Sequence, residues 1–186
     1  MPAKNRAVFV DRDGTLNINI DYLSDPARYQ LYPGVASGLK MLRDAGFIIV
    51  VVTNQSGIGR GIFDERTLEM IHLRMKELLA LEGASVDAIY FCPHHPNDRC
   101  ACRKPGTALF ERAVRELDID PESSFVIGDT ELDVGAGKKM GAMTALVPEP
   151  RHRARTLGEM KNWNARPDFV GEDFLDAVRW VLGKRV

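Results

Sequence analysis

Two aspartates separated by one residue stand out in the stretch AVFVDRDGTLN, residues 7–17. Asp11 and Asp13 directly follow a short apolar run, and negative charges in that place do nothing to stabilise a buried strand. Further polar residues follow later apolar runs. These are Thr53 and Asn54 after FIIVVV, Arg103 and Lys104 after a cysteine-rich loop, and Asp129 and Asp133 in GDTELD.

Carboxylates that meet at one point repel each other unless a cation lies among them, and hard oxygen ligands favour Mg²⁺. A carboxylate beside Mg²⁺ can attack phosphorus and form an aspartyl-phosphate, which is the role we expect for Asp11. Asp13, two residues on along an extended chain, would point the same way and act as general acid and base. Thr53 and Lys104 could hold the equatorial phosphate oxygens. This set of residue types predicts phosphoryl transfer.

The cysteines indicate a second metal. The chain has three of them, an odd number confined to residues 92–102, whereas a disulfide scaffold would spread an even number along the chain. Cys92-Pro-His94 and Cys100-Ala-Cys102 together offer three thiolates and one imidazole, which is enough for tetrahedral zinc. All four positions would be filled by protein, so we expect a structural Zn²⁺ that rigidifies the loop before Arg103 and Lys104.

The elements that must position these residues alternate between strand and helix. Apolar runs and β-branched residues predict strands, and helical spacing with Pro and Gly at the ends predicts helices. The expected strands are 6–10, 47–52, 87–91, 124–127, 142–147 and 168–170, and the expected helices are 33–45, 64–82, 106–117, 132–140 and 172–182. This order predicts an α/β fold with a doubly wound parallel sheet, in one domain covering residues 1–186. Ligands of such sheets bind beyond the carboxyl ends of the strands, where the polar residues would converge.

Composition limits the other possibilities. The formal net charge of the 186 residues is −1, which argues against binding nucleic acid or a membrane surface through charge alone. No long apolar run predicts a membrane span or a signal peptide, so we expect a cytoplasmic protein. Nothing in the sequence demands a partner, and we expect a monomer. The segment 148–167 is expected to be a surface excursion, and its basic run 151–155 a solvated loop.

The motifs together resemble those of the haloacid-dehalogenase-type (HAD) phosphatases. DRDGT, Thr53, Lys104 and GDTELD correspond to the four motifs of that superfamily, and VVVTNQSGIGRG, YFCPHHP and CACRKP resemble the branch of D,D-heptose 1,7-bisphosphate phosphatases and histidinol-phosphatases. The resemblance covers roughly residues 8–147. It implies a magnesium-dependent phosphomonoesterase with a HAD-like, Rossmann-type fold.

The resemblance also implies roles for individual residues. Asp11 would be the nucleophile, Asp13 the acid/base that reaches Mg²⁺ through its backbone carbonyl, and Asp129 the third magnesium residue, with Asp133 behind them. Thr53 and Lys104 would hold phosphate. The residues expected to contact substrate are Arg12, Asn19, Tyr22, Asn54, Gln55, Ser56, Arg103 and Thr130.

The expected substrate is D-glycero-D-manno-heptose 1,7-bisphosphate, hydrolysed at its 7-phosphate during nucleotide-heptose synthesis. Three alternatives remain at this point: a phosphatase for histidinol phosphate or another small molecule, a 3′-phosphatase for DNA ends, and a non-catalytic zinc-loop binding protein. Segment 14–33 is too short for a cap domain, and segment 57–87 is used by a helix. We therefore expect an open site roofed only by a flap, residues 17–29, and by the zinc loop.

Overall fold

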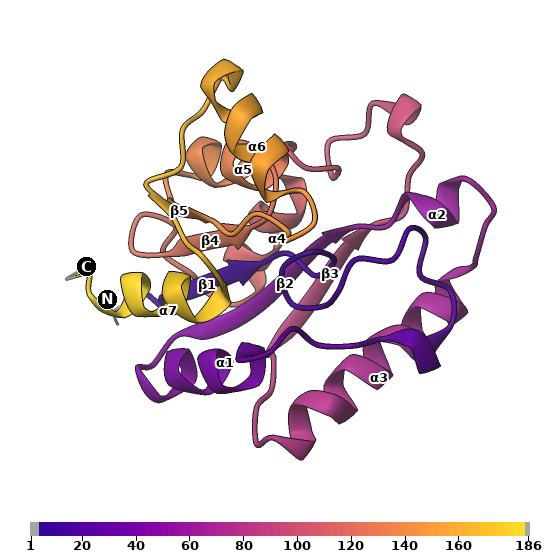
Figure 1. Cartoon of the computed structure of the whole chain (residues 1–186), viewed down its shortest axis with the longest axis horizontal. Coiled ribbons are helices and arrows are strands. Elements are labelled where there is room, and N and C mark those ends of the chain that lie inside the picture. The colour runs from indigo at the N-terminus through magenta and orange to yellow at the C-terminus, as the bar shows by residue number, and fades with distance from the viewer. Residues whose placement is uncertain (1–3, 185–186) are drawn as a thin grey trace.

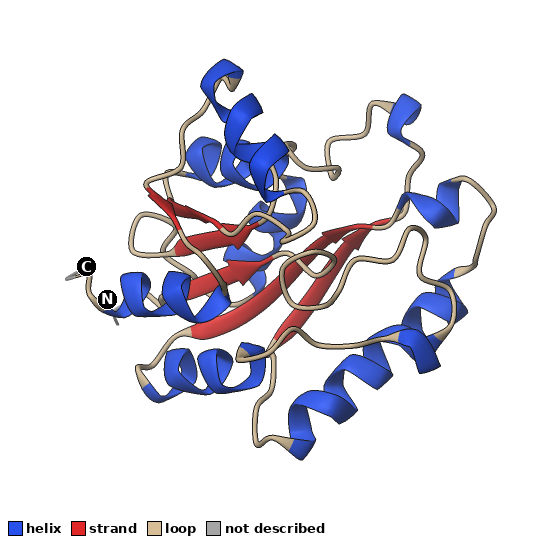
Figure 2. Cartoon of the chain, viewed as in Figure 1, coloured by secondary structure: helices blue, strands red, loops and turns tan. Residues whose placement is uncertain are grey.

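The computed structural model describes residues 4–184 and contains a six-stranded, fully parallel sheet in the order β3-β2-β1-β4-β5-β6 (Figures 1 and 2). The predicted doubly wound architecture is confirmed. The strands are β1 (Ala7–Val10), β2 (Ile48–Asn54), β3 (Ala88–Cys92), β4 (Phe125–Gly128), β5 (Met143–Leu146) and β6 (Phe169–Val170).

Helices cover both faces of the sheet. The helices are α1 (Val35–Asp44), α2 (Ser56–Gly59), α3 (Glu65–Leu81), α4 (Ala108–Glu116), α5 (Glu131–Met140), α6 (Arg153–Glu159) and α7 (Phe174–Leu182). The buried side chains of α1, α3 and α7 pack in one core with Val8 and Val10, whereas those of α4 and α5 pack in a second core with Phe9. This division follows from the strand, in which successive side chains point to opposite faces.

Strand β2 is a central strand, and its continuous apolar sequence corresponds to burial on both faces of the sheet. It pairs with β1 on one side and β3 on the other, and its side chains from Ile49 to Val52 are fully buried in the two cores. The strand runs further than predicted, so that Thr53 and Asn54 are its last two residues instead of following it. Both polar side chains therefore have positions fixed by the sheet ladder.

Two short helices were missed by the sequence analysis. Helix α2 lies in the glycine-rich segment after β2, where intrinsic helix propensity is low. Helix α6 and a 3₁₀ turn, Met160–Asn162, lie within segment 148–167, which is at the surface as expected but contains regular structure. The other expected elements are present with ends shifted by a few residues.

The strand order reverses between β1 and β4. From β1 the chain adds β2 and β3 on one side, then crosses to place β4 on the other side of β1. Such a switch point leaves a crevice outside the carboxyl ends of the strands. Asp11 leaves β1 and Asp129 leaves β4 at this point, which brings together two residues 118 positions apart in the chain.

No large cap covers this crevice in the part of the chain that the structure describes. Between β1 and α1 the only regular element is a 3₁₀ turn, Pro26–Arg28, and between β2 and β3 the chain forms α2 and α3. The expectation of a site without a large cap domain is confirmed. Among residues 4–184, no helix is both long and apolar enough to span a membrane.

Candidate active site

Three carboxylates gather at the switch point. One oxygen from each of Asp11, Asp129 and Asp133 lies within 4.8 Å of those of the other two, and Asp129 and Asp133 are buried. Asp11 follows β1 and its backbone N donates to Ile127 O of β4 at 3.0 Å, which fixes its place beside the GDTELD segment. The three carboxylates therefore come from two neighbouring strand ends and the first turn of α5.

Two glycines allow the three carboxylates to lie this close together. A Cβ on Gly14, whose φ is +89°, would lie 2.5 Å from Asp129 Oδ2, and one on Gly128 would lie 2.3 Å from Cβ of Asp133. Contacts this short do not occur between real side chains, so a larger residue at either position would displace a carboxylate. The glycines of DRDGT and GDTELD are thus needed for close approach.

Lys104 is the cation present among the carboxylates. Its Nζ donates to Asp11 Oδ1 and to Asp133 Oδ1, both at 2.6 Å, and to Val52 O at 2.8 Å. The residue is only 4% exposed, so these three acceptors replace its hydration shell. The opposing carboxylates raise the pKa of Lys104 despite its burial, and the side chain stays charged.

One ammonium does not compensate three buried carboxylates. Burial, opposed by Lys104 and assisted by Asp133, raises the pKa of Asp11 to about 6. Burial and the charge of Asp11 raise the pKa of Asp129 well above its usual value, and Asp129 Oδ1 is buried without a hydrogen-bond partner among residues 4–184. An additional cation bound there would lower both pKa values, and the oxygen donors suit Mg²⁺. The residues present thus fit the predicted magnesium ion.

Asp13 lies in the same pocket but its carboxylate points elsewhere. It accepts hydrogen bonds from Arg12 Nη2 at 2.7 Å, Gln55 Nε2 at 2.8 Å and Asn17 Nδ2 at 3.0 Å. Burial would raise the pKa of Asp13, but the Arg12 charge and these hydrogen bonds outweigh burial and hold it below its usual value. Asp13 is therefore an anion here. Its carboxylate is not one of the three that gather, and a metal contact through its backbone carbonyl stays a prediction.

The regular strand β1 ends at Val10, but Asp11 N still pairs with β4, and Asp11 and Asp13 both line the pocket. Backbone N atoms of Thr15, Leu16 and Asn17 all donate to Arg12 O, forming a tight turn around Asp13. This turn directs the chain away from the sheet directly after the two aspartates.

Arg12 is placed apart from the other residues expected to contact substrate. Its side chain is 1% exposed, is absent from the pocket wall and pairs with Asp13, so its contact with substrate stays a prediction. In this arrangement Arg12 acts on the charge and orientation of Asp13.

The carboxylates open into a pocket of about 470 Å³. The predicted residues that line it are Asp11, Asp13, Asn19, Tyr22, Thr53, Asn54, Gln55, Ser56, Arg103, Lys104, Asp129 and Thr130. The structure thus brings together every predicted catalytic and substrate-binding residue except Arg12. Asp133 lies beneath the wall, hydrogen-bonded to Lys104.

Several of these side chains are already occupied by protein contacts. The Asn54 amide accepts from Lys104 N at 3.0 Å and donates to Lys104 O at 3.4 Å, which fixes the backbone that carries the ammonium. The Thr130 hydroxyl donates to Asp133 Oδ2 at 2.6 Å as a helix cap of α5. Gln55 spans Asp13 and Thr53 Oγ1, at 2.8 Å each. The sequence analysis missed these positioning contacts, which join strands that no local pattern connects.

Arg103 differs from these neighbours. It lines the pocket beside Lys104, and its Nη1 atom is buried with no hydrogen-bond partner among the described residues. Arg103 thus places a guanidinium with unused hydrogen-bonding capacity at the pocket wall, and such a group can bind an anion in a bidentate way.

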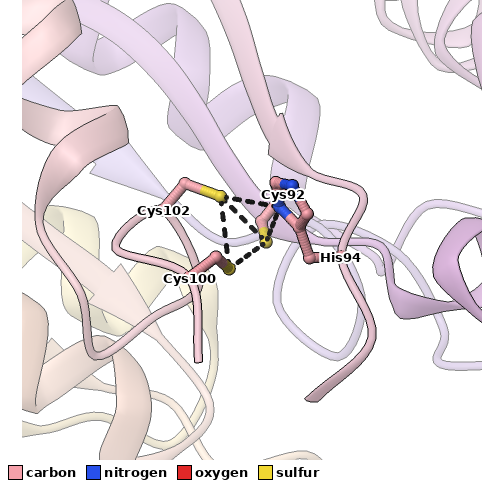
Figure 3. Close-up of side chains that lie close together, drawn as sticks. All are labelled: Cys92, His94, Cys100 and Cys102. Atoms are coloured by element: carbon pink, nitrogen blue, oxygen red, sulfur yellow. Dashed lines mark hydrogen bonds between the residues drawn. The ribbon is translucent and has the colours of Figure 1, made fainter. Parts of the chain in front are cut away.

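The cysteine-rich loop forms the predicted four-residue cluster (Figure 3). Sulfur–sulfur separations are 3.2 Å for Cys92–Cys102, 3.4 Å for Cys100–Cys102 and 3.5 Å for Cys92–Cys100, and His94 Nδ1 lies 3.1 Å from Cys102 Sγ. Zinc–sulfur bonds of about 2.3 Å in a tetrahedron place sulfurs roughly 3.7 Å apart, so the cluster has the size of a zinc site. The cysteines are free thiols, not disulfides.

The cluster holds the loop next to the pocket. His95 is not part of it, because its Nδ1 accepts from Asn97 N at 3.1 Å and caps the 3₁₀ turn Pro96–Asp98. On the other side, Gly59 N of α2 donates to Pro93 O at 2.8 Å. The loop thus braces α2 and leads directly into Arg103 and Lys104.

The basic run 151–155 is mostly exposed, as expected, but Arg151 also contacts a buried residue. Arg151 Nε donates to Glu149 Oε1 at 2.7 Å, and Glu149 is only 2% exposed. No motif or periodicity in the sequence indicated a buried glutamate here.

Comparison with known proteins identifies close relatives of this arrangement. Residues 101–177 match the HAD-hydrolase-like family model. The chain is 37% identical to D-glycero-beta-D-manno-heptose-1,7-bisphosphate 7-phosphatase of Haemophilus ducreyi, over 95% of this chain and 98% of the relative. It is 41% identical to the enzyme of that name from Helicobacter pylori, over 89% of this chain and 98% of the relative.

Two solved structures of heptose bisphosphate phosphatases are similar to this chain in fold and sequence. The crystal structure of D,D-heptose 1,7-bisphosphate phosphatase from B. bronchiseptica, complexed with magnesium and phosphate, aligns with a TM-score of 0.85 and 34% identity over 95% of this chain and 98% of that one. The Burkholderia thailandensis protein of that name aligns with a TM-score of 0.73 and 30% identity, over 97% of this chain and 100% of that one.

Proposed function

This chain belongs to the HAD-like family that contains the D-glycero-beta-D-manno-heptose-1,7-bisphosphate 7-phosphatases, and from that membership we propose that it hydrolyses the 7-phosphate of this heptose bisphosphate. The reaction would serve nucleotide-heptose synthesis. The substrate is small and carries two phosphates, so it needs one reaction centre and one further anion-binding group.

The single observation that carries the proposal is the state of Arg103. The residue lines the pocket that also holds Asp11 and Lys104, and its Nη1 atom has no hydrogen-bond partner among the described residues. A second phosphate on the substrate would supply the missing acceptor, and a guanidinium can bind phosphate in a bidentate way. Histidinol phosphate instead offers a cationic amine and an imidazole, which an arginine does not favour.

The proposed reaction has two steps, the formation and the hydrolysis of an aspartyl-phosphate. In the first step a carboxylate oxygen of Asp11 bonds to phosphorus while the bond from phosphorus to the sugar oxygen breaks, and Asp13 gives a proton to that oxygen. In the second step water attacks the aspartyl-phosphate, inorganic phosphate leaves, and Asp13 takes the water proton. Pairing with Arg12 holds the pKa of Asp13 below its usual value and favours the anion that the second step requires, whereas the first step requires its protonated form.

The remaining polar groups hold the transferring phosphoryl group. Lys104 Nζ, 2.6 Å from Asp11, is in place to contact an equatorial oxygen, and the Thr53 hydroxyl lies at the end of the adjacent strand. Mg²⁺ bound by Asp11 and Asp129, with the backbone carbonyl of Asp13, would neutralise charge on the phosphate and the carboxylates. Zn²⁺ bound by the Cys92, His94, Cys100 and Cys102 cluster would rigidify the loop before Arg103.

The test compares phosphate release from the heptose bisphosphate, histidinol phosphate and a simple aryl phosphate, with and without Mg²⁺. We expect the bisphosphate to have the highest kcat/KM, and Arg103→Ala to raise its KM more than that of the aryl phosphate. Arg115→Ala, which removes the same charge from the exposed face of α4, is the matched control. Better turnover of histidinol phosphate by the wild type would overturn the substrate assignment.

The proposal also covers the oligomeric state and the cellular location of the enzyme. We propose a monomer, because the site is complete within one chain, and a cytoplasmic location, because the three zinc-ligand thiols suit a reducing compartment. Size-exclusion chromatography with light scattering and cell fractionation test these two points.

A further inference from the structure

The flap, residues 17–29, forms one wall of the pocket through residues 19–23. Its ends are well held. Asn17 forms a bridge with Leu31, Ile18 N donates to Gln30 O at 2.9 Å, and Leu23 and Tyr29 are 3% and 2% exposed. The stretch between Ile18 and Leu23 has no regular structure and contains Tyr22, whose φ is +51°, an unfavourable value for a non-glycine residue. The wall therefore needs contacts from outside the flap.

Glu149 and Arg151 supply such contacts from the loop after β5. Asn19 Nδ2 donates to Glu149 Oε2 at 3.4 Å, and Arg151 Nη2 donates to the backbone carbonyl of Asn19. Arg151 Nε also donates to Glu149 Oε1 at 2.7 Å, so the two residues form a closed group around Asn19. We name this group the latch.

The latch is built into the fold. Glu149 is 2% exposed, and a buried carboxylate is retained only where partners compensate its lost hydration. It has three partners in Arg151, Asn19 and His152, whose Nδ1 lies 3.0 Å away. The loop itself starts from a fixed point, because Val147 N donates to Gly128 O at 2.8 Å, next to Asp129.

We propose that Glu149 and Arg151 are positioning residues that fix the flap wall against the sugar of the substrate. Neither lines the pocket, so each acts through Asn19 and its neighbours. The inference rests on the proposed function for its substrate. The flap wall contacts the part of a bisphosphate beyond the reacting phosphate, whereas a flat aryl phosphate depends mainly on the carboxylates and Lys104.

The experiment uses Glu149→Gln and Arg151→Gln in the full-length protein. We expect each to raise KM for the heptose bisphosphate roughly 2- to 5-fold, the effect of losing a charged contact in which one partner, Arg151, is exposed. We expect kcat, and KM for an aryl phosphate, to change less than twofold. The double variant should be no worse than the more affected single variant, because both break one group. Arg155→Gln, on α6 and 65% exposed, is the matched control.

Hydrogen exchange without substrate separates this inference from the proposed function. Amides of residues 18–23 should exchange faster in both latch variants than in the wild type and in Arg155→Gln. If the wild type fails to hydrolyse the bisphosphate but this exchange rises, the proposed function fails and the latch stands. Unchanged exchange and unchanged KM in both variants would overturn the latch. Equal losses of kcat on both substrates would also overturn it, because they would indicate general structural damage.

Discussion

Replacement of Lys104 by methionine tests how this site tolerates three buried carboxylates. Methionine keeps most of the volume and removes the ammonium. The change leaves Asp11 and Asp133 without the partner that lies 2.6 Å from each, and Val52 O without its donor at 2.8 Å. Lys104 is 4% exposed, so water does not replace these contacts freely.

The expected loss follows from the number and burial of the contacts. Removing one partner of a buried ion pair costs about 3–5 kcal/mol, because an uncompensated charge stays behind. At about 2–4 °C per kcal/mol for a protein of this length, Tm should fall by roughly 6–20 °C. Loss of the group that holds the phosphate should lower kcat at least about 10²-fold.

The assay is urea unfolding at pH 7.5 with a chelator present, since a divalent cation would partly replace the ammonium. Lys40→Met, which removes an exposed lysine from α1, serves as control and should stay within about 0.5 kcal/mol of the wild type. A loss below about 1 kcal/mol for Lys104→Met would refute the view that this lysine compensates the carboxylates. Added Mg²⁺ should stabilise the variant more than the wild type.

The loss of stability caused by Lys104→Met should depend on pH in a defined direction. Burial raises the pKa of Asp11 to about 6, above its unfolded value of about 4. A carboxyl with a raised folded pKa contributes stability that is present below the unfolded value and lost as pH rises through the folded value. Without Lys104 that folded pKa rises further, so Asp11 is protonated at pH 5. The destabilisation should therefore be smaller at pH 5 than at pH 7.5.

Three further changes test the chemistry and the zinc cluster. Asp11→Asn should abolish turnover with an unchanged circular dichroism spectrum, because an amide keeps the shape but does not attack phosphorus; near-normal activity would disprove the nucleophile assignment. Asp13→Asn should still bind substrate and lose about 10²- to 10⁴-fold in kcat, measured by steady-state kinetics. Cys100→Ser should lower zinc from about one per chain by elemental analysis, lower Tm, and raise KM through the loop that carries Arg103; zinc-free wild type, prepared without chelator, would contradict this.

The sequence determined the features that local chemistry encodes. The apolar run 47–52 predicted a buried strand, and the alternation of strands with helices predicted a parallel sheet; the structure confirms the sheet and places residues 48–52 in β2. Because such a sheet brings its strand ends to one edge, Asp11, Lys104 and Asp129 could be assigned to one site without coordinates. The close spacing of Cys92, His94, Cys100 and Cys102 in the sequence likewise allowed these four residues to be assigned to one metal-binding cluster.

The tertiary structure decided which partner each polar atom has. Gln55 bonds to Asp13 from 42 residues away, and Arg151 bonds to Asn19 from 132 residues away. Such pairs depend on strand order and on turns such as the one at Arg12, which local residue patterns do not specify. Glu149 is the clearest case: its sequence neighbours indicate an exposed charge, yet the loop after β5 buries it, because Arg151, His152 and Asn19 together replace the water it loses.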